Sequence, residues 1–252
     1  MTLIPPELRL YAGGGLIALS FVTPTITAVL SIGGGMTMLA ALAAVAPAPA
    51  IIPIQGAVQA GSNMARVYLL RRSIAWRISA VFTLGTLAGV AVGGMLVVQL
   101  PADFLRIILA LFIIYSVWGP TGLQLPRTGN ATLLGGGFVT AFLTMFVGAT
   151  GPFLASVLAP RIADRFTYVA THGLCVLVQH VLKVFIFGAL GFAFLPWLPM
   201  LALMLVAGFA GTWVGTRILH RLPEAVFRKI LRAILTLVAV WLLVSALGGI
   251  AL

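Results

Sequence analysis

The sequence predicts an all-α polytopic membrane protein made of two inverted repeats, each containing four elements. Of its 252 residues, 62% are hydrophobic and 8% are charged, whereas soluble globular domains carry about 25% charged residues. The apolar residues form runs of roughly 20, the length that an α-helix needs to cross a 30 Å hydrocarbon layer. The order of these runs repeats in the second half of the chain. The ten-residue alternation of a transmembrane barrel does not occur.

Eight hydrophobic segments follow one another along the chain. Six have the length of a single helix, but the first and the fifth are too long for one crossing, since 30 helical residues extend about 45 Å. Both long segments are interrupted, the first by a glycine triplet at 33–35 and the fifth at 148–152. The segments cover residues 10–46, 51–70, 74–98, 104–119, 132–160, 167–191, 196–219 and 225–247.

The first segment lacks both a basic region before it and a small-residue cleavage site after it. We therefore interpret it as structure and not as a signal peptide, and we expect the mature chain to equal the whole chain. The single cysteine, Cys175, allows no intrachain disulfide and no cysteine metal cluster. We expect it to be a small buried side chain, and we expect no cofactor or metal.

An internal repeat relates the two halves, residues 1–125 and 126–252, within one transmembrane domain. An offset of 122 residues places Gly89, Val92, Gly93, Leu100, Pro101, Arg106, Ile108 and Leu109 on Gly211, Val214, Gly215, Leu222, Pro223, Arg228, Ile230 and Leu231. An offset of 117 places Gln55, Gly56, Asn63 and Arg66 on His172, Gly173, His180 and Lys183. Each repeat thus contains four elements, the first of them broken.

The charges of corresponding loops predict how the repeats are oriented. The loop at 46–50 has no charge, while its counterpart in the second half contains Arg161 and Arg165. In the other two pairs of corresponding loops, one loop is also strongly basic and its counterpart is not. Because positive loops face the cytoplasm, the repeats should be inverted, which requires an odd number of crossings in each.

We predict that each broken element is a re-entrant hairpin followed by three crossings, giving six full crossings among six to eight transmembrane segments. Both termini then lie on the non-cytoplasmic side, where Arg9 and Arg106 are the only basic loop residues. The cytoplasmic face receives eleven basic residues: Arg71, Arg72, Arg77, Arg127, Arg161, Arg165, Arg217, Arg221, Arg228, Lys229 and Arg232. Topology thus accounts for the net charge of +11, and we expect a lipid bilayer and no nucleic acid as partner.

The two breaks predict a central anion site. Unwound backbone at membrane depth is tolerated only where protein or a wet cavity surrounds it, and a new half-helix should start near Met36 and near Pro152. Helix starts offer unpaired N–H groups with partial positive charge, and two of them facing each other suit an anion. The alternative is that the glycines only permit close helix packing. The candidate residues of the breaks are Gly33, Gly34, Gly35, Met36, Gly148, Thr150 and Gly151.

Two polar stripes lie on the elements that follow the breaks. Polar side chains inside a bilayer usually face a cavity or one another. Lys183 lies about eight residues from the nearer helix end, too deep to snorkel easily, whereas Arg66 is closer to its end and could snorkel. Beyond Gln55, Thr171 and Cys175, the stripes supply the substrate-binding candidates Gln59, Ser62, Asn63, Arg66, His172, Gln179, His180 and Lys183.

The charge of the interior favours an anionic substrate. All four carboxylates, Glu7, Asp103, Asp164 and Glu224, fall in predicted loops, which leaves no intramembrane carboxylate for a cation site. His172 and His180 could exchange protons near neutral pH, which allows proton coupling, or could hydrogen-bond between helices while neutral. Motifs of membrane enzymes, such as paired aspartates or His-Glu-x-x-His, do not occur, so we expect no enzymatic activity.

The chain resembles the sulfite exporter TauE/SafE family, the sulfonate-uptake permeases. The resemblance rests on Ile32-Gly33-Gly34-Gly35-Met36, on the polar second element leading into Arg71-Arg72, on the stretch from Gly89 to Pro101, and on their repetition. It implies a carrier of sulfite, sulfonates or related small organic anions in the bacterial inner membrane. Many members have Ala-Thr-Ser where this chain has Gln59-Ala60-Gly61-Ser62, a departure within the candidate site.

From these features we expect a secondary transporter that binds a small oxyanion, such as sulfite or a sulfonate, or an organic acid anion between the breaks and exposes it alternately to either side. Gln59, Ser62 and Asn63 would donate hydrogen bonds and Lys183 would supply charge, with Arg66 as a weaker candidate. An anion channel of the same architecture and a membrane subunit without transport activity are the alternatives.

Overall fold

The computed structural model describes residues 3–5, 8–30, 33–97, 129–148, 150–158, 161–162, 164–218, 236 and 240. All regular structure within this part of the chain is helical. The first repeat contributes α1 (Leu10–Leu30), α2 (Gly34–Val45), α3 (Ala48–Leu70), the 3-10 turn η1 (Arg71–Ser73) and α4 (Trp76–Val97). The second contributes α6 (Asn130–Val147), α7 (Gly151–Leu158), α8 (Arg165–Ala189), the 3-10 turn η2 (Leu195–Trp197) and α9 (Leu198–Ile218).

Both long segments break where the glycines predicted it. The half-helices α2 and α7 begin at Gly34 and Gly151, which are 117 residues apart and within two residues of the expected starts. Gly33 and Gly148 have φ values of 101° and 77°, a region that glycine enters at little cost. Gly148 caps α6, with its N–H donating to the Thr144 carbonyl, so the backbone itself ends one helix before the next begins.

Each broken segment folds back on itself as a hairpin with arms of unequal length. The helix α1 packs against α2, and α6 against α7. With 21 residues, α1 extends about 32 Å, whereas the 12 residues of α2 extend about 18 Å. The corresponding arms of the second hairpin have 18 and 8 residues. The chain therefore returns toward its starting side through a short half-helix in both repeats.

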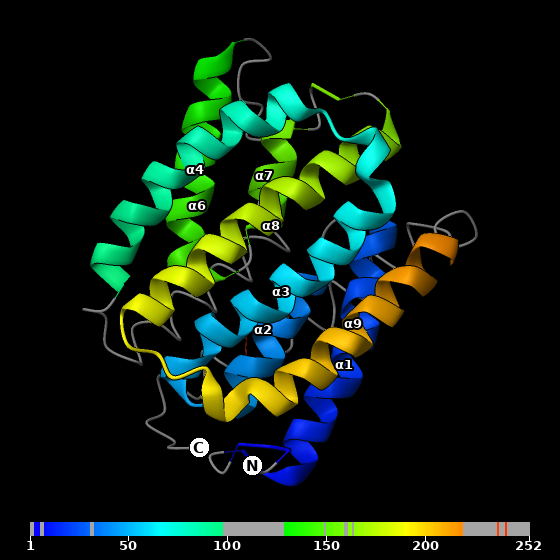
Figure 1. Cartoon of the computed structure of the whole chain (residues 1–252), viewed down its shortest axis with the longest axis vertical. Helices are drawn as coiled ribbons and strands as arrows, with labels where there is room; N and C mark the ends of the chain where they lie inside the picture. Colours follow the sequence, from blue (N-terminus) through cyan, green and yellow to red (C-terminus); the bar gives the residue numbers. More distant parts are fainter. Residues whose placement is uncertain are drawn as a thin grey trace.

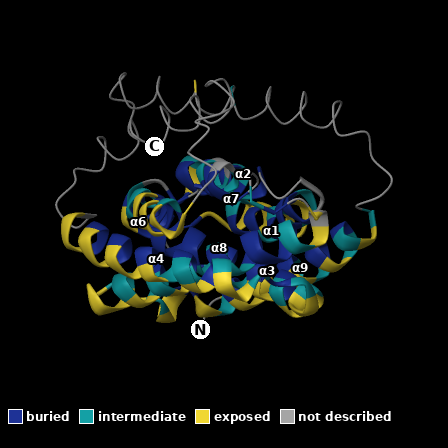
Figure 2. Cartoon of the chain, turned by 90° about the horizontal axis from the view of Figure 1, so that it is seen from above, coloured by how far each residue is buried: buried dark blue, intermediate teal, exposed yellow. Residues whose placement is uncertain are grey.

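The helices form two layers, and an approximate two-fold axis relates the two repeats. One layer has the order α4, α8, α3, α9, and the hairpins lie on it, with α6 against α4 and α1 against α9 (Figures 1 and 2). Exchanging α1 with α6, α2 with α7, α3 with α8, and α4 with α9 reproduces these packing partners. Buried residues concentrate between the layers (Figure 2), and α2 contributes the fully buried Met38, Leu39 and Leu42 to the core.

Glycines from the repeat set the closest helix contacts. A Cβ on Gly89 of α4 would meet the backbone carbonyl of Phe138 on α6, and a Cβ on Gly211 of α9 would meet that of Phe21 on α1. One turn further along, a Cβ on Gly93 would meet the Met145 side chain, and a Cβ on Gly215 would meet the Thr25 carbonyl. Because glycine has no side chain, the helix backbones can approach closely at these positions, as they do at small residues in membrane helices generally. The same glycines that aligned in sequence thus perform the same packing role.

The two repeats are inverted. Gly56 of α3 lies against Lys183 of α8 while Gly173 of α8 lies against Arg66 of α3, so these central helices run antiparallel. The described loop cations also segregate as predicted. Arg9 lies at the start of α1, whereas the opposite end of the bundle, where α3 and α9 end and α8 begins, carries Arg71, Arg72, Arg77, Arg161 and Arg217 (Figure 1).

Four of the described helices are long and apolar enough to cross a membrane: Leu10–Ala28, Trp76–Leu96, Phe166–Ala189 and Leu195–Ile218. The helix α3 has 23 residues, but its inward polar side chains lower its hydropathy. The protein is therefore a multi-pass helical membrane protein. The predicted segment 104–119 lies outside the described residues, and so does 225–247 except for residues 236 and 240. The basic residues at 106, 127, 221, 228, 229 and 232 also lie outside them.

Candidate functional site

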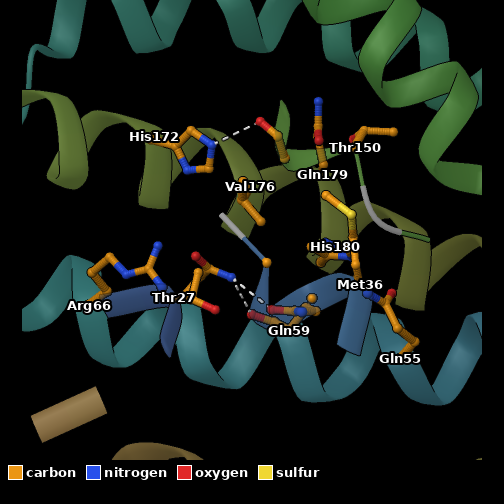
Figure 3. Close-up of a pocket in the computed structure, with 14 residues that line it drawn as sticks. Thr27, Met36, Gln55, Gln59, Arg66, Thr150, His172, Val176, Gln179 and His180 are labelled. Carbon is orange, nitrogen blue, oxygen red and sulfur yellow. Dashed lines mark hydrogen bonds between the residues drawn. The ribbon is translucent and has the colours of Figure 1, made fainter. Parts of the chain in front are cut away.

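A polar cavity lies between the two central helices and the two breaks. Its volume is about 40 Å³, room for roughly three water-sized groups. Residues of α3 line one side and residues of α8 the other, with Met36 and Thr150 contributed by the breaks (Figure 3). The lining residues are Thr27, Gly33, Gly35, Met36, Gln55, Gln59, Asn63, Arg66, Thr150, Gly151, His172, Val176, Gln179 and His180.

The cavity collects polar groups that have no partner within the protein. Among the described residues, ten buried side-chain nitrogen and oxygen atoms lack a hydrogen-bond partner, and eight of them belong to cavity-lining residues. Buried polar groups in proteins are nearly always paired, and each exception calls for an explanation. Such a concentration at one place indicates a site that a polar ligand or water fills. The eight atoms are both amide atoms of Gln55, Asn63 Oδ1, the three guanidinium nitrogens of Arg66, His172 Nδ1 and His180 Nδ1.

Arg66 brings to this cavity a positive charge that no described residue compensates. Its side chain is 0% exposed, and its three nitrogens have no acceptor among the described residues. The only described carboxylate, that of Asp164, is exposed at the start of α8. A buried charge is costly unless it is paired and hydrogen-bonded, so this guanidinium is the described group that an anionic or strongly polar ligand would stabilise most.

The α3 side of the cavity is held in place by hydrogen bonds along one helix face. The residues at 55, 59, 63 and 66 share this face because they are spaced by three or four positions. Asn63 Nδ2 donates to the Gln59 backbone carbonyl at 2.8 Å and lies 3.4 Å from Gln59 Oε1 (Figure 3). Ser62 Oγ donates to the same oxygens of Gln59 at 3.2 and 3.3 Å. These bonds orient the Gln59 amide, while Gln55 keeps both of its amide atoms available.

The α8 side supplies two histidines and a glutamine. His172 Nε2 lies 3.4 Å from the Gly151 carbonyl at the second break, and the Nδ1 atoms of His172 and His180 are buried without partners. Gln179 Nε2 donates to Thr140 Oγ1 at 2.8 Å, which ties α8 to α6. This side of the cavity therefore offers imidazole nitrogens and no fixed charge.

Lys183 is equally buried but does not line the cavity. Its side chain is 0% exposed, and Nζ lies 3.2 Å from Thr144 Oγ1 and 3.5 Å from the Gly148 carbonyl. Both acceptors belong to the last turn of α6 and its cap, where the helix dipole favours a cation. In this conformation the positive charge at the cavity comes from Arg66.

The starts of both half-helices border the cavity. Gly33, Gly35 and Met36 come from one and Thr150 and Gly151 from the other. The carbonyls of Gly33 and Thr150 accept the first helical hydrogen bonds, and Gly33 offers no side chain to cap the N–H groups that follow. Helix starts of this kind attract anions, and here they meet the charge of Arg66.

The structure brings together eleven of the fifteen sequence-predicted site residues. Arg66, considered the weaker of the two cations in sequence, lies at the cavity and is 0% exposed, although the four residues that follow it in α3 are not buried. The other four predicted residues do not line the cavity but lie next to residues that do. Gly34 lies against Thr23 and Thr27, Ser62 bonds to Gln59, and Gly148 and Lys183 interact with each other.

Three lining residues were not among the predicted site residues. Gln55 belongs to the predicted stripe, four residues before Gln59, and its spacing already indicated the same face. Val176 occupies the position equivalent to Gln59, 117 residues later, so the repeat could have identified it. Thr27 comes from α1, and only the fold of the hairpin brings it to the cavity. No group of three or more metal-ligating side chains occurs within the described residues.

Comparison with known proteins assigns the chain to a family. The sulfite exporter TauE/SafE family matches residues 16–242, which cover both repeats and the whole cavity. No curated protein and no solved structure matches the chain. Because the match extends over most of the sequence, the chain belongs to the sulfite exporter TauE/SafE family of membrane transporters.

Proposed function

We propose that the protein is a secondary transporter that carries sulfite or a small sulfonate across a bacterial inner membrane, binding it in the cavity between α3 and α8. This proposal depends mainly on the guanidinium of Arg66, which is fully buried, lines the cavity and has no partner among the described residues. A compact oxyanion would supply the missing acceptors. Charge-assisted hydrogen bonds to a guanidinium are among the strong ones in proteins.

The other lining groups suit the same ligand. The Gln55 amide nitrogen is an unused donor, and the two half-helix starts add backbone donors and partial positive charge. A volume of about 40 Å³ fits a head group of three or four heavy atoms better than a long organic chain. The lack of a described carboxylate at the cavity disfavours a cationic substrate.

Counterflow in proteoliposomes tests this function against the channel alternative. Vesicles loaded with unlabelled sulfite should take up external labelled sulfite faster than empty vesicles, because a carrier exchanges one anion for another. At sulfite concentrations below half-saturation, Arg66→Met should weaken this stimulation, whereas Arg72→Met, which changes an exposed arginine in η1, should retain it. A flux that preloading does not stimulate would identify a channel, and no flux of sulfite or sulfonates would contradict the proposal.

Proton coupling is a further part of the proposal and rests on the two histidines. Each lines the cavity and presents a buried, unpartnered Nδ1, so a proton could travel beside the anion. With coupling, a pH gradient alone should drive sulfite accumulation in wild-type vesicles. His180→Gln should then still bind sulfite but should no longer accumulate it. Accumulation unchanged in both His172→Gln and His180→Gln would argue against coupling through these residues.

A further inference from the structure

The two buried cations occupy equivalent positions in the inverted repeats. Arg66 on α3 and Lys183 on α8 are 117 residues apart, the same offset that relates the starts of α2 and α7. The aliphatic part of each side chain, here called its stem, contacts a glycine of the opposite helix. A Cβ on Gly173 would come 3.1 Å from Arg66 Cδ, and a Cβ on Gly56 would come 3.0 Å from Lys183 Cδ. These glycines are also 117 residues apart, so the approximate two-fold axis relates the whole arrangement.

The ends of the two side chains break this symmetry. Lys183 is docked on its own repeat, with Nζ near Thr144 Oγ1 and the carbonyl of Gly148 at the end of α6. Arg66 is not docked: its nitrogens have no described partner and it lines the cavity. The equivalent of Thr144 is Thr27, near the end of α1. Thr27 Oγ1 donates to the Thr23 carbonyl at 2.8 Å and retains lone pairs that could accept from a cation.

Inverted repeats that hold the same sequence positions in different states are the structural basis of alternating access. Such transporters expose one site to either side as one repeat moves against the other. When the repeats exchange conformations, the environment of Lys183 becomes that of Arg66, and the reverse. The symmetry of the contacts therefore implies an exchange of roles between the two cations.

We propose that Arg66 and Lys183 alternate as the anion-binding cation: Arg66 faces the cavity while Lys183 is docked on Thr144, and in the oppositely facing state Lys183 faces it while Arg66 docks on Thr27. The proposal rests on the proposed anion site and adds which residue serves each state. It also assigns a role to Lys183, whose burial behind the cavity wall has no other explanation in the described structure. The docked cation is compensated by a helix end and the free one by the substrate.

Removing the two docking hydroxyls should shift the conformational equilibrium in opposite directions. Thr144→Val weakens the docking of Lys183 and favours the opposite state, whereas Thr27→Val weakens the docking of Arg66 and favours the state described here. The readout is alkylation of Val176→Cys, in a Cys175→Ser background, by an impermeant maleimide added to either side of the membrane. The ratio of the two labelling rates should move about tenfold in opposite directions, the effect of one hydrogen bond to a charged group.

Matched variants keep the test interpretable. Thr216→Val removes a hydroxyl that bonds only to the carbonyl of Trp213 at the end of α9, and it should leave the ratio unchanged. Thr27→Ser and Thr144→Ser retain the hydroxyl and should restore the wild-type ratio. Shifts in the same direction for both valine variants, or no shift in either, would overturn the proposal. Labelling needs no transported substrate, so its outcome is separate from a failure to move sulfite.

A transport measurement provides a second test of the proposed exchange between Arg66 and Lys183. In vesicles that contain the protein in one orientation, Arg66→Met should raise the half-saturation concentration for sulfite about tenfold on one side, and Lys183→Met should raise it on the other. Both effects on the same side, or none for Lys183→Met, would contradict the exchange of roles even if Arg66 binds the anion. If wild-type protein transports no anion while the labelling ratios shift as expected, the proposed substrate is wrong and the cation exchange stands.

Discussion

Gly56 of α3 lies directly under the stem of Lys183 on α8, and Gly173 of α8 lies in the same way under the stem of Arg66 on α3. At 3.0 and 3.1 Å from the cation stems, an added Cβ would be closer than ordinary van der Waals contact. Both cations therefore reach their positions because a glycine faces them, and the cavity depends on these two small residues as much as on its polar ones.

Gly173→Ala should weaken anion binding by moving Arg66. The stem is flexible enough to shift, so the variant should fold, but its guanidinium should lose part of its alignment at the cavity. We expect about a tenfold rise in the half-saturation concentration for sulfite, the order of one hydrogen bond to a charged group. Gly135→Ala on α6, where an added Cβ meets nothing within 4 Å, is the matched control. Equal affinities for both alanine variants would show that the contact does not position Arg66.

The closest helix contacts should be destabilised by a single methyl group. In Gly89→Ala and Gly211→Ala the new Cβ meets a backbone carbonyl, of Phe138 and of Phe21 respectively, which cannot rotate away. We expect each variant to lose about 1–3 kcal/mol of stability, as overpacking typically does, measured as a lower Tm in detergent. Gly14→Ala in α1 has open space around the new atom and should keep the wild-type Tm. A wild-type Tm for Gly89→Ala would contradict this packing.

The start of α8 should give the protein a pH dependence at its basic end. Asp164 accepts hydrogen bonds from the Thr167 N–H and the Thr167 hydroxyl, both at 2.7 Å, and the hydroxyl bond contributes most to lowering the pKa of this carboxyl below its ordinary value of 3.8. A depressed folded-state pKa means that the cap stabilises fully above the ordinary value and that this stabilisation is lost as the pH falls through the lower one.

Asp164→Asn is the variant that checks this dependence, because asparagine caps helices without titrating. Between about pH 5 and pH 3 the Tm of the wild type should fall relative to that of Asp164→Asn. Asp164→Ala should have a lower Tm than both at neutral pH. Parallel Tm curves for wild type and Asp164→Asn across this range would exclude a contribution from the carboxylate.

Much of the fold was predictable because its signals are local. The glycine triplet at 33–35 and the Gly-Ala-Thr-Gly-Pro break each interrupt an apolar segment that is too long for one crossing, and the charge of the loops indicates their orientation. The interrupted segments and the inverted repeats could therefore be inferred. The 117-residue offset, first seen between Gln55 and His172, also relates the starts of α2 and α7.

The division of labour between the two cations could not be predicted. Depth along a helix suggested Lys183 as the charged group of the site, yet its amine is docked on α6. Which of two equivalent side chains faces the cavity depends on contacts between helices far apart in sequence. Thr27 was not predicted for the same reason. The sequence around a threonine in an apolar helix does not indicate which residues of other helices will lie beside it.

The most direct test of the anion site is sulfite binding to the purified protein, with Arg66→Lys, Arg66→Met and the exposed Arg72→Met compared with the wild type. We expect Arg72→Met to bind like the wild type, Arg66→Lys to bind more weakly because it loses the planar fork of donors, and Arg66→Met to lose at least about tenfold in affinity. Sulfite binding to Arg66→Met with wild-type affinity would contradict the account.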